Sequence, residues 1–472
     1  MLVVKCQFST GFLLISPSGT PHTCLGMSGS TNKSNFMGMG NSKFSQLMSE
    51  EKVSKERLER LNLLLQTDGC LDHVNGSWSW KWNKAGCVNC SESNYSFYAS
   101  VIPDDKIDRN DVLAPPLHNQ RELYFVPSLL SSSQVKTLLD MIANQIQKQR
   151  QGVSPKTKCI VAIEDGEKKV IANTDQSDQC IASFLDPIIT NQILPVTRGI
   201  LQEPKLAVAD SIVRWYIVED VDEGSNENLP PHYDLTSFAS MIIPLNPEEC
   251  EGGLYVQYGA SHESRRTVDF QMHRHGSKSN KKNEMSGLKG GDAIIHRYDV
   301  THGVNLKKGT RFSLVFWMAD KQSIKSRTAP WVTTDAINRK SVHAAFLYAM
   351  NAQNGIHGVP KDEKVAQEYW EWAAERGHAL SQYMLSMLLL RVGFDNDPLR
   401  KESKVEWSTR IVSLLKESAD RGLDLSQHSL AQTYRYGYHG VAIDESLATK
   451  YYIAAARQGY TKSIEALLEK VV

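Results

Sequence analysis

One segment recurs three times in the last third of the chain, and it constrains the fold more than any other feature of the sequence. The stretch AAERGHALSQ around Gly377 returns as SADRGLDLSQ around Gly422 and, in degraded form, as AARQGYTKSI around Gly459. The three glycines are 45 and 37 residues apart. Self-similarity at such a spacing is typical of stacked helical hairpins, each of which buries its apolar face on the next. We therefore expect residues 340–472 to form an all-α solenoid, with each glycine at the turn between two helices.

A second motif accompanies this repeat. Gly358-Val-Pro-Lys-Asp-Glu returns as Gly440-Val-Ala-Ile-Asp-Glu. The whole stretch that begins at Gly358, GVPKDEKVAQEYWEWAAERGHA, resembles the Sel-one-like relative of the tetratricopeptide repeat. The resemblance covers residues 340–472 in about three units. It implies a protein-binding or architectural region, and hence a protein partner bound through the C-terminal repeats.

Length and charge exclude several classes of protein for the chain as a whole. A chain of 472 residues has room for roughly three domains at ~150 residues each. Its 53 basic and 53 acidic residues balance, which excludes a globally basic nucleic-acid binder and a wholly acidic solvating chain. Because no apolar run approaches the ~18 residues needed to cross a bilayer, we expect no transmembrane segment.

The first 49 residues contain no Asp or Glu, and Glu50 is the first acid. The segment is rich in Ser, Thr, Gly and Met, which cannot build a core, so we interpret residues 1–49 as a disordered or targeting segment. Its composition favours an organellar transit peptide, for a plastid or a mitochondrion, over a secretory signal. The sequence alone leaves the compartment open.

Residues 50–118 form an N-terminal region that we leave unassigned. Its first part, Glu50–Gln66, has apolar residues at helical spacing. Its second part, residues 68–100, contains tryptophans and the pair Cys87-x-x-Cys90. The eight cysteines of the chain are too few for a disulfide scaffold, and whether Cys87 and Cys90 are paired, free or metal-bound stays open.

Residues 119–330 consist of short β-rich segments separated by turn residues. A strand near Tyr124 and a Ser-capped helix open the region. The segments that we expect as strands are Ser211–Val218, Ser237–Pro244, Gly253–Tyr258, Asp292–His296 and Arg311–Trp317. Several short strands with turn signals between them favour a sandwich or a jelly-roll barrel. We therefore predict an α+β multidomain chain, in which a jelly-roll core (a double-stranded β-helix) with flanking helices precedes the helical repeats.

The triplet His232-Tyr233-Asp234 is the most informative one in this region. Residues i and i+2 of an extended segment point to one face, so His232 and Asp234 can offer an imidazole and a carboxylate to the same ion. Thr301-His302-Gly303 can supply a third ligand from a neighbouring strand. Two His and one carboxylate form the facial triad of non-haem Fe(II) oxygenases, which leaves coordination positions open. We predict that His232, Asp234 and His302 bind the metal and carry the catalysis.

A candidate anion receptor follows the triad. In an alternating strand Arg311 and Ser313 share a face. An arginine fork with a neighbouring hydroxyl is a good receptor for a carboxylate, because its donors match the geometry of the anion. This pattern fits a keto acid whose far carboxylate is anchored away from the metal.

Taken together with Glu251-Gly-Gly253, the arrangement resembles the Fe(II)/2-oxoglutarate dioxygenase superfamily, and most closely its prolyl 4-hydroxylase-like catalytic domain. The resemblance covers about residues 120–320. It implies that the iron ligands are His232, Asp234 and His302, and that the residues binding the co-substrate are Arg311, assisted by Ser313, and Tyr216. The sequence departs from that pattern in the long acidic link Ile217–Pro231 and in the insertion Ser261–Ser286.

The resemblance implies an enzyme that hydroxylates a protein or peptide side chain, such as prolyl. Its cofactor would be Fe(II), with 2-oxoglutarate and O2 as co-substrates and ascorbate as a candidate reductant. Two alternatives stay open. One is a non-catalytic helical-repeat adaptor with a degenerate oxygenase domain, and the other is an oxygenase for a small molecule or a nucleic acid, suggested by the basic loop Arg265–Lys282. We interpret the pair His273-x-His275 in that loop as solvated surface and His296 as a structural residue.

Overall fold

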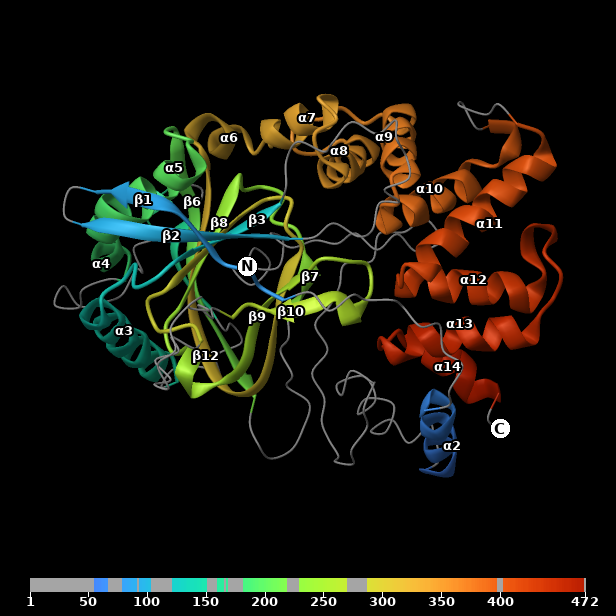
Figure 1. The fold of residues 1–472 in the computed structure, drawn as a ribbon, viewed down its shortest axis with the longest axis horizontal. Coiled ribbons are helices and arrows are strands. Elements are labelled where there is room, and N and C mark those ends of the chain that lie inside the picture. Colours follow the sequence, from blue (N-terminus) through green and yellow to red (C-terminus); the bar gives the residue numbers. More distant parts are fainter. Residues whose placement is uncertain are drawn as a thin grey trace, which may run out of the picture.

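The computed structural model describes residues 55–66, 79–90, 93–102, 121–150, 159–164, 167–168, 181–218, 229–269, 287–396 and 402–470. The expected targeting segment 1–49 and the pair His273-x-His275 lie outside the described residues. A curled antiparallel sheet with flanking helices lies beside a stack of helices (Figure 1). The expected mixed α+β class is therefore confirmed, while the jelly roll and the solenoid stay predictions.

Most strands belong to one large antiparallel sheet. The strand order is β1-β2-β3-β11-β8-β12-β6-β4-β5. The bounds of these strands are β1 (Asn83–Asn89), β2 (Asn94–Val101), β3 (Glu122–Val126), β4 (Cys159–Glu164), β5 (Glu167–Lys168), β6 (Leu206–Val218), β8 (Ala239–Pro244), β11 (Ala293–Arg297) and β12 (His302–Asp320).

A small sheet shares strand β12 with the large one. It consists of β7 (Leu229–His232), the first part of β12, β9 (Glu251–Gln257) and β10 (Arg265–Thr267). Residues 302–308 of β12 pair with β9, whereas residues 309–320 pair with β6 in the large sheet. Because β12 passes from one sheet to the other, it carries His302 in the small sheet and Arg311 in the large one.

Helices cover the face of the large sheet that lies away from the small sheet. They are α3 (Ser132–Arg150), α4 (Ile181–Ile188), the π-helix η2 (Ile189–Ile193) and α5 (Leu194–Leu201). Their apolar side chains, such as Leu138 and Leu185, share one buried cluster with sheet residues such as Met241 and Leu314. This core packs against one face of the large sheet, and the candidate site lies on the other face. Three shorter helices in the same part are η3 (Pro247–Glu249), η4 (His262–Ser264) and α6 (Lys321–Ser326).

The helical part follows directly. Each of its α-helices packs against the next one along the chain. The bounds are α7 (Pro330–Ile337), α8 (Val342–Asn354), α9 (Glu363–Glu375), α10 (Ala379–Val392), η5 (Phe394–Asn396), α11 (Lys404–Asp420), α12 (Asp424–Tyr436), η6 (Tyr438–Gly440), α13 (Glu445–Arg457) and α14 (Thr461–Lys470).

The recurring sequence motifs have structural reasons. Gly377, Gly422 and Gly459 follow α9, α11 and α13 with φ of +77°, +96° and +86°, a conformation that favours glycine. Gln382 and Gln427 occupy equivalent positions, and each donates a 3.2 Å hydrogen bond to an alanine carbonyl eight residues earlier. The predicted turn at each recurring glycine is thus present.

The second motif contains a helix cap. Asp362 accepts hydrogen bonds from the backbone N–H groups of Lys364 and Val365 at the start of α9. Asp444 caps α13 in the same way through Leu447 N–H. The aspartate recurs because each helix that follows it has backbone donors without intrahelical partners.

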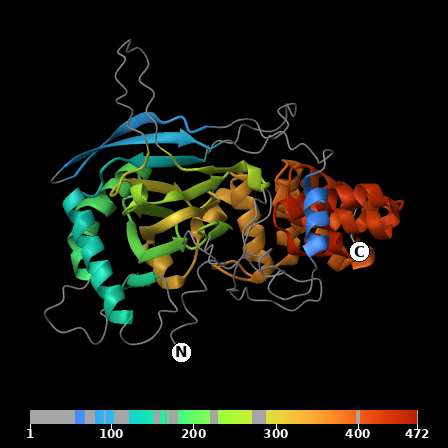
Figure 2. The ribbon, with the colours of Figure 1, turned by 90° about the horizontal axis from the view of Figure 1, so that it is seen from below.

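The N-terminal helix α2 (Lys55–Gln66) lies against the last helices of the chain (Figure 2). Arg57 donates a 2.6 Å hydrogen bond to Leu468 O, and Arg457 donates a 2.8 Å bond to Leu65 O. Strands β1 and β2, in contrast, extend the large sheet. The region that we left unassigned, residues 50–118, therefore contributes to both parts of the molecule.

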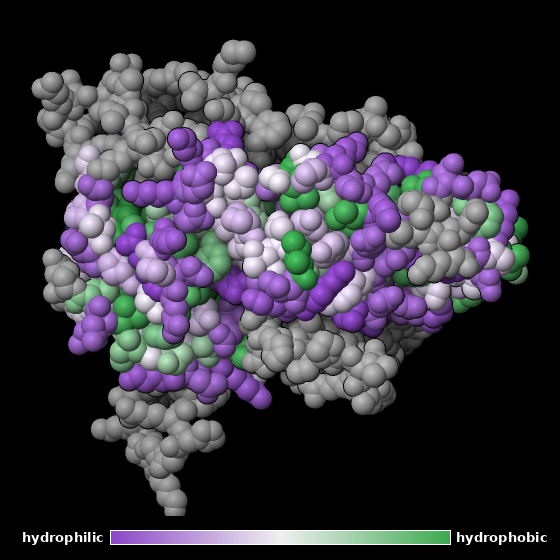
Figure 3. Space-filling view, turned by 90° about the horizontal axis from the view of Figure 1, so that it is seen from above, coloured by the Kyte–Doolittle hydropathy of each residue, from purple (hydrophilic) through white to green (hydrophobic). Residues whose placement is uncertain are grey.

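One face of the molecule is largely hydrophilic, with small separate hydrophobic areas on its described residues (Figure 3). Among the helices that the structure describes, none combines the length and the apolar character needed to span a membrane.

Candidate metal centre

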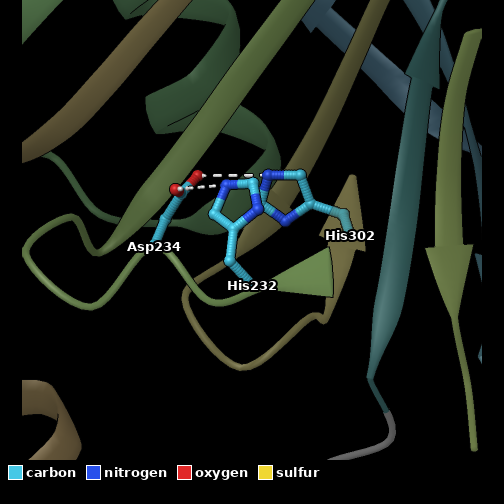
Figure 4. A group of neighbouring side chains, drawn as sticks. All are labelled: His232, Asp234 and His302. Atoms are coloured by element: carbon cyan, nitrogen blue, oxygen red, sulfur yellow. Dashed lines mark ion pairs between the residues drawn. The ribbon is translucent and has the colours of Figure 1, made fainter. Parts of the chain in front are cut away.

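The structure brings the three predicted metal ligands together (Figure 4). His232 ends β7, Asp234 follows two residues later, and His302 begins β12. His232 and His302 are directly paired across the small sheet. Asp234 Oδ1 lies 3.6 Å from His232 Nε2, and Asp234 Oδ2 lies 3.5 Å from His302 Nε2. All three side chains are buried.

Backbone carbonyls orient both imidazole rings. His232 Nδ1 lies 2.9 Å from Pro230 O, and His302 Nδ1 lies 3.2 Å from Val300 O. Because a carbonyl oxygen only accepts, each Nδ1 donates, and in the neutral ring the lone pair is then on Nε2. An outer partner of this kind fixes the tautomer in which a histidine can bind a metal.

Asp234 is held as a carboxylate. The Ser240 hydroxyl donates a 2.5 Å hydrogen bond to Asp234 Oδ2. Burial raises the pKa of this carboxyl, but the surrounding imidazoles and the Ser240 hydrogen bond lower it by more, so its pKa lies below the ordinary value. Burial lowers the pKa of His302 well below its usual value, and so does the neighbouring His296.

The three residues fit a divalent metal ion. Their ligand atoms all lie within 4.8 Å of one another. Two imidazole nitrogens and one carboxylate on a shared edge are the donors of the non-haem Fe(II) facial triad. The site lies in buried surroundings, where a lone carboxylate would be unfavourable without a positive partner.

The remaining predicted site residues form a second cluster on the large sheet. Arg311 and Tyr216 are directly paired across β12 and β6. Arg311 Nε donates a 3.1 Å hydrogen bond to Ser313 Oγ. The ring of Tyr216 packs with Val304 and Leu306 of the small-sheet part of β12. This apolar contact connects the cluster to the strand that begins with His302.

Arg311 is a buried cation whose counter-charge is missing from the described residues. Its side chain is 2% exposed, and no carboxylate of the described residues pairs with it. Burial lowers its pKa from the ordinary arginine value, which is high enough that the guanidinium stays charged. Gly253 leaves the space that the guanidinium fills, because a Cβ at this position would lie 2.3 Å from Arg311 Nη1. A buried unpaired guanidinium is a suitable receptor for a carboxylate ligand.

The structure places one further histidine beside the site, which the sequence analysis interpreted as a structural residue. His296, on β11, is fully buried, and its Nε2 lies 4.0 Å from Asp234 Oδ2. Its ring packs on His302 with 4.2 Å between the ring centroids. No local sequence pattern indicates this position, because it arises from the strand order β11-β8-β12.

The helical part contacts the segment that carries the ligands. Tyr233, between His232 and Asp234, lies with its hydroxyl 2.9 Å from His343 Nδ1 in α8. Tyr298, between His296 and His302, donates a 2.7 Å hydrogen bond to Asp335 in α7. Both tyrosines belong to the same buried cluster as the helical repeats. The first helices of the helical part therefore support the back of the candidate site.

Comparison with known proteins gives matches among solved structures only. No family model matches the chain, and no curated protein matches it. A Sel1 repeat protein from Oxalobacter formigenes is 26% identical over 29% of this chain and 95% of that protein, with a TM-score of 0.25.

Two further solved structures are similar to a larger share of the chain. The epimerase SnoN, solved in complex with Fe3+, alpha ketoglutarate and nogalamycin RO, is 13% identical over 42% of this chain and 78% of that one, with a TM-score of 0.27. A Pseudomonas putida prolyl-4-hydroxylase is 12% identical over 42% of this chain and 92% of that one, with a TM-score of 0.26.

Proposed function

We propose that the chain is an Fe(II)- and 2-oxoglutarate-dependent dioxygenase that hydroxylates a protein or peptide side chain, with prolyl as the first candidate. In this proposal residues 119–330 carry the reaction and residues 340–472 bind a protein partner or the substrate. Residues 1–49 direct the protein to an organelle.

The observation that carries the proposal is the pairing of two buried sites on one strand. His302 and Arg311 both belong to β12. The first residue of the strand, His302, presents an imidazole nitrogen beside a carboxylate and a second imidazole, and Arg311 in the middle of the strand presents a cation without a described counter-charge. A dicarboxylic keto acid requires this pair, a metal for its keto end and a cation for its far carboxylate.

When bound, iron together with 2-oxoglutarate and O2 supplies the oxidising chemistry, which yields succinate, CO2 and a hydroxylated product. His232, Asp234 and His302 hold the metal in a fixed orientation, since carbonyls and a hydroxyl fix their own positions. Arg311 binds the far carboxylate, Ser313 holds the guanidinium, and Tyr216 shields this contact from water. Ascorbate is the proposed reductant.

Turnover of 2-oxoglutarate to succinate tests the proposal. Protein loaded with Fe(II) without oxygen is exposed to O2, with and without proline-rich peptides. We expect iron-dependent succinate formation in the wild type, no formation with Asp234→Ala, and a KM for 2-oxoglutarate raised by roughly 10-fold or more with Arg311→Gln, since a charged hydrogen bond contributes about 1.5–3 kcal/mol.

His428→Ala is the matched control, because it removes a buried imidazole from α12, outside the site. It should keep the wild-type turnover. A wild type that binds no iron and forms no succinate, with every variant equally inactive, would overturn the proposal and favour the adaptor. Stimulation by peptide would support a protein substrate.

A further inference from the structure

A third imidazole faces the candidate metal centre. His296 Nε2 lies 4.0 Å from Asp234 Oδ2. The ring is fully buried, and within the described residues its Nε2 atom has no hydrogen-bond partner. It does not belong to the set of three residues whose ligand atoms are mutually close. His296 thus lies beside the metal ligands without being part of their group.

The outer contact of His296 is the same as that of the two ligand histidines. Its Nδ1 lies 2.9 Å from Arg297 O. Since the carbonyl accepts, Nδ1 carries the proton, and the lone pair of the neutral ring is on Nε2. The backbone therefore aims a hydrogen-bond acceptor, and not a donor, toward Asp234.

Two acceptors facing each other need a donor between them. Asp234 Oδ2 and His296 Nε2 both offer lone pairs, and their separation of 4.0 Å is too long for a direct hydrogen bond. A water molecule that donates one proton to each, at ~2.8 Å, fits this distance. Buried polar atoms that lack a protein partner are commonly paired with such waters.

We propose that His296 is a positioning residue, whose Nε2 accepts a hydrogen bond from a water molecule that also donates to Asp234 Oδ2. The water and the Ser240 hydroxyl then both donate to Asp234 Oδ2, so that the carboxylate meets the metal in one orientation. This inference rests on the proposed function only in that His232, Asp234 and His302 bind a divalent metal.

Two variants separate the contributions of the two ring nitrogens, Nδ1 and Nε2. In His296→Asn the amide replaces the Nδ1 position and keeps a donor for Arg297 O, but the Nε2 position is lost. In His296→Gln the amide reaches the Nε2 position and keeps a polar group near Asp234. His428→Asn serves as the control for a buried histidine away from the site.

The first measurement is the affinity for Co(II), by equilibrium dialysis of the full chain, together with the visible spectrum of the Co(II) protein. Loss of an outer-shell partner typically weakens metal binding 10- to 100-fold. We expect a loss in about this range and a changed spectrum for His296→Asn, near wild-type values for His296→Gln, and no change for His428→Asn. Equal Co(II) affinity and spectra for the wild type and His296→Asn would overturn the inference. So would wild-type affinity in His296→Asn together with weakened affinity in His296→Gln.

The second measurement is the number of imidazole nitrogens bound to Cu(II), by pulsed electron paramagnetic resonance. We expect two in the wild type and two in His296→Asn. Three in the wild type would make His296 itself a ligand and would overturn the positioning role. A wild type that binds no metal would instead overturn the proposed function, so the two failures are distinguishable.

Discussion

The buried histidines of the sheet and those of the helical part differ in what their Nδ1 atoms contact. In the sheet the partners are backbone carbonyls, and the pairs are His232 with Pro230 O, His296 with Arg297 O and His302 with Val300 O. Among the buried histidines of the helical part the partners are hydroxyls, and the pairs are His343 with Tyr233 and His428 with Ser463. The half-buried His378 lies against the Ser381 hydroxyl.

The difference decides what each ring can do. A carbonyl forces Nδ1 to donate, so every neutral sheet imidazole presents a lone pair at Nε2. A hydroxyl can donate or accept, so it imposes no tautomer, and at His378 the ring nitrogen even accepts from Ser381 N–H. The sheet histidines thus present lone pairs that a metal ion could use. In the helical part His378 caps α10, and His343 and His428 make packing contacts. Buried histidines occur in both regions, so burial does not distinguish the two kinds of histidine, whereas the hydrogen-bond partner of Nδ1 does.

The strongest test of this comparison removes one imidazole from each region. His302→Ala should weaken Co(II) binding by more than about 100-fold, beyond the range for outer-shell partners. His428→Ala should leave the affinity within about 3-fold, since its ring lies among helices. The metal content after dialysis measures both. Equal losses in the two variants would contradict the distinction.

The second test uses acid. Burial, with a smaller effect of Lys462, lowers the pKa of His428 to about 4. In the unfolded chain His428 is protonated below about pH 6.5, whereas in the folded chain it is protonated only below about pH 4. Between these two pH values the unfolded state therefore binds more protons, so the free energy of unfolding decreases as the pH falls. At one pKa unit per 1.36 kcal/mol, we expect a loss of about 1–2 kcal/mol between pH 7 and pH 5.

Urea denaturation at the two pH values measures that loss. His428→Gln should make the stability of the protein less dependent on pH by this amount. His439, which is half-buried in η6, provides a control, and His439→Gln should change the pH dependence less. An unchanged slope in His428→Gln would show that the ring has no such role.

The third test crosses the boundary between the regions. Tyr233→Phe removes the hydroxyl that pairs with His343, and a buried hydrogen bond contributes about 1 kcal/mol to the free energy of unfolding. Because Tyr233 lies between two candidate metal ligands, we also expect Co(II) affinity to fall, by less than the ~10-fold that marks the lower end for outer-shell partners. Calorimetry with and without Co(II) measures both. A change in stability without any change in affinity would show that the helices do not support the metal site.

The smallest effect is expected at the repeated helix caps. Asp362→Ala and Asp444→Ala each remove a cap, which typically costs about 1 kcal/mol of stability. Metal affinity should not change in either variant. Thermal unfolding measures the loss, and a matching value for the two variants would support equivalent roles in the repeats. A cap variant that released the metal would contradict the comparison.

Much of the strand pattern could be predicted from alternation and turn residues. Strands β6, β8, β9 and β11 overlap the expected segments, with ends displaced by a few residues. The proximity of His232 and Asp234 was predicted from the two-residue period of an extended segment, although Asp234 lies two residues beyond the end of β7. His302 was predicted as a third ligand from a neighbouring strand. Strand β12 is longer than expected because its residues stay paired while it passes between the sheets.

Other features depend on contacts that local patterns do not contain. Helices α4 and α5 escaped prediction because Pro187 and Pro195 resemble helix breakers. Strand β7 contains two prolines and was not expected as a strand, but it lies at the edge of the small sheet, where proline is tolerated. His296 escaped because its position beside Asp234 arises from the strand order β11-β8-β12.

Two hydrogen bonds join α2 to the last helices, one from Arg57 to Leu468 O and one from Arg457 to Leu65 O, and they affect how copies of this protein could associate. Leu61 and Leu65 of α2 are buried in one cluster with Leu467 and Leu468 of α14. The terminal helices of a stack of hairpins have an apolar face that another hairpin could cover. In this protein α2 covers that face of α13 and α14. Shortening the chain to begin at residue 79 would bare this leucine seam and promote end-to-end oligomers.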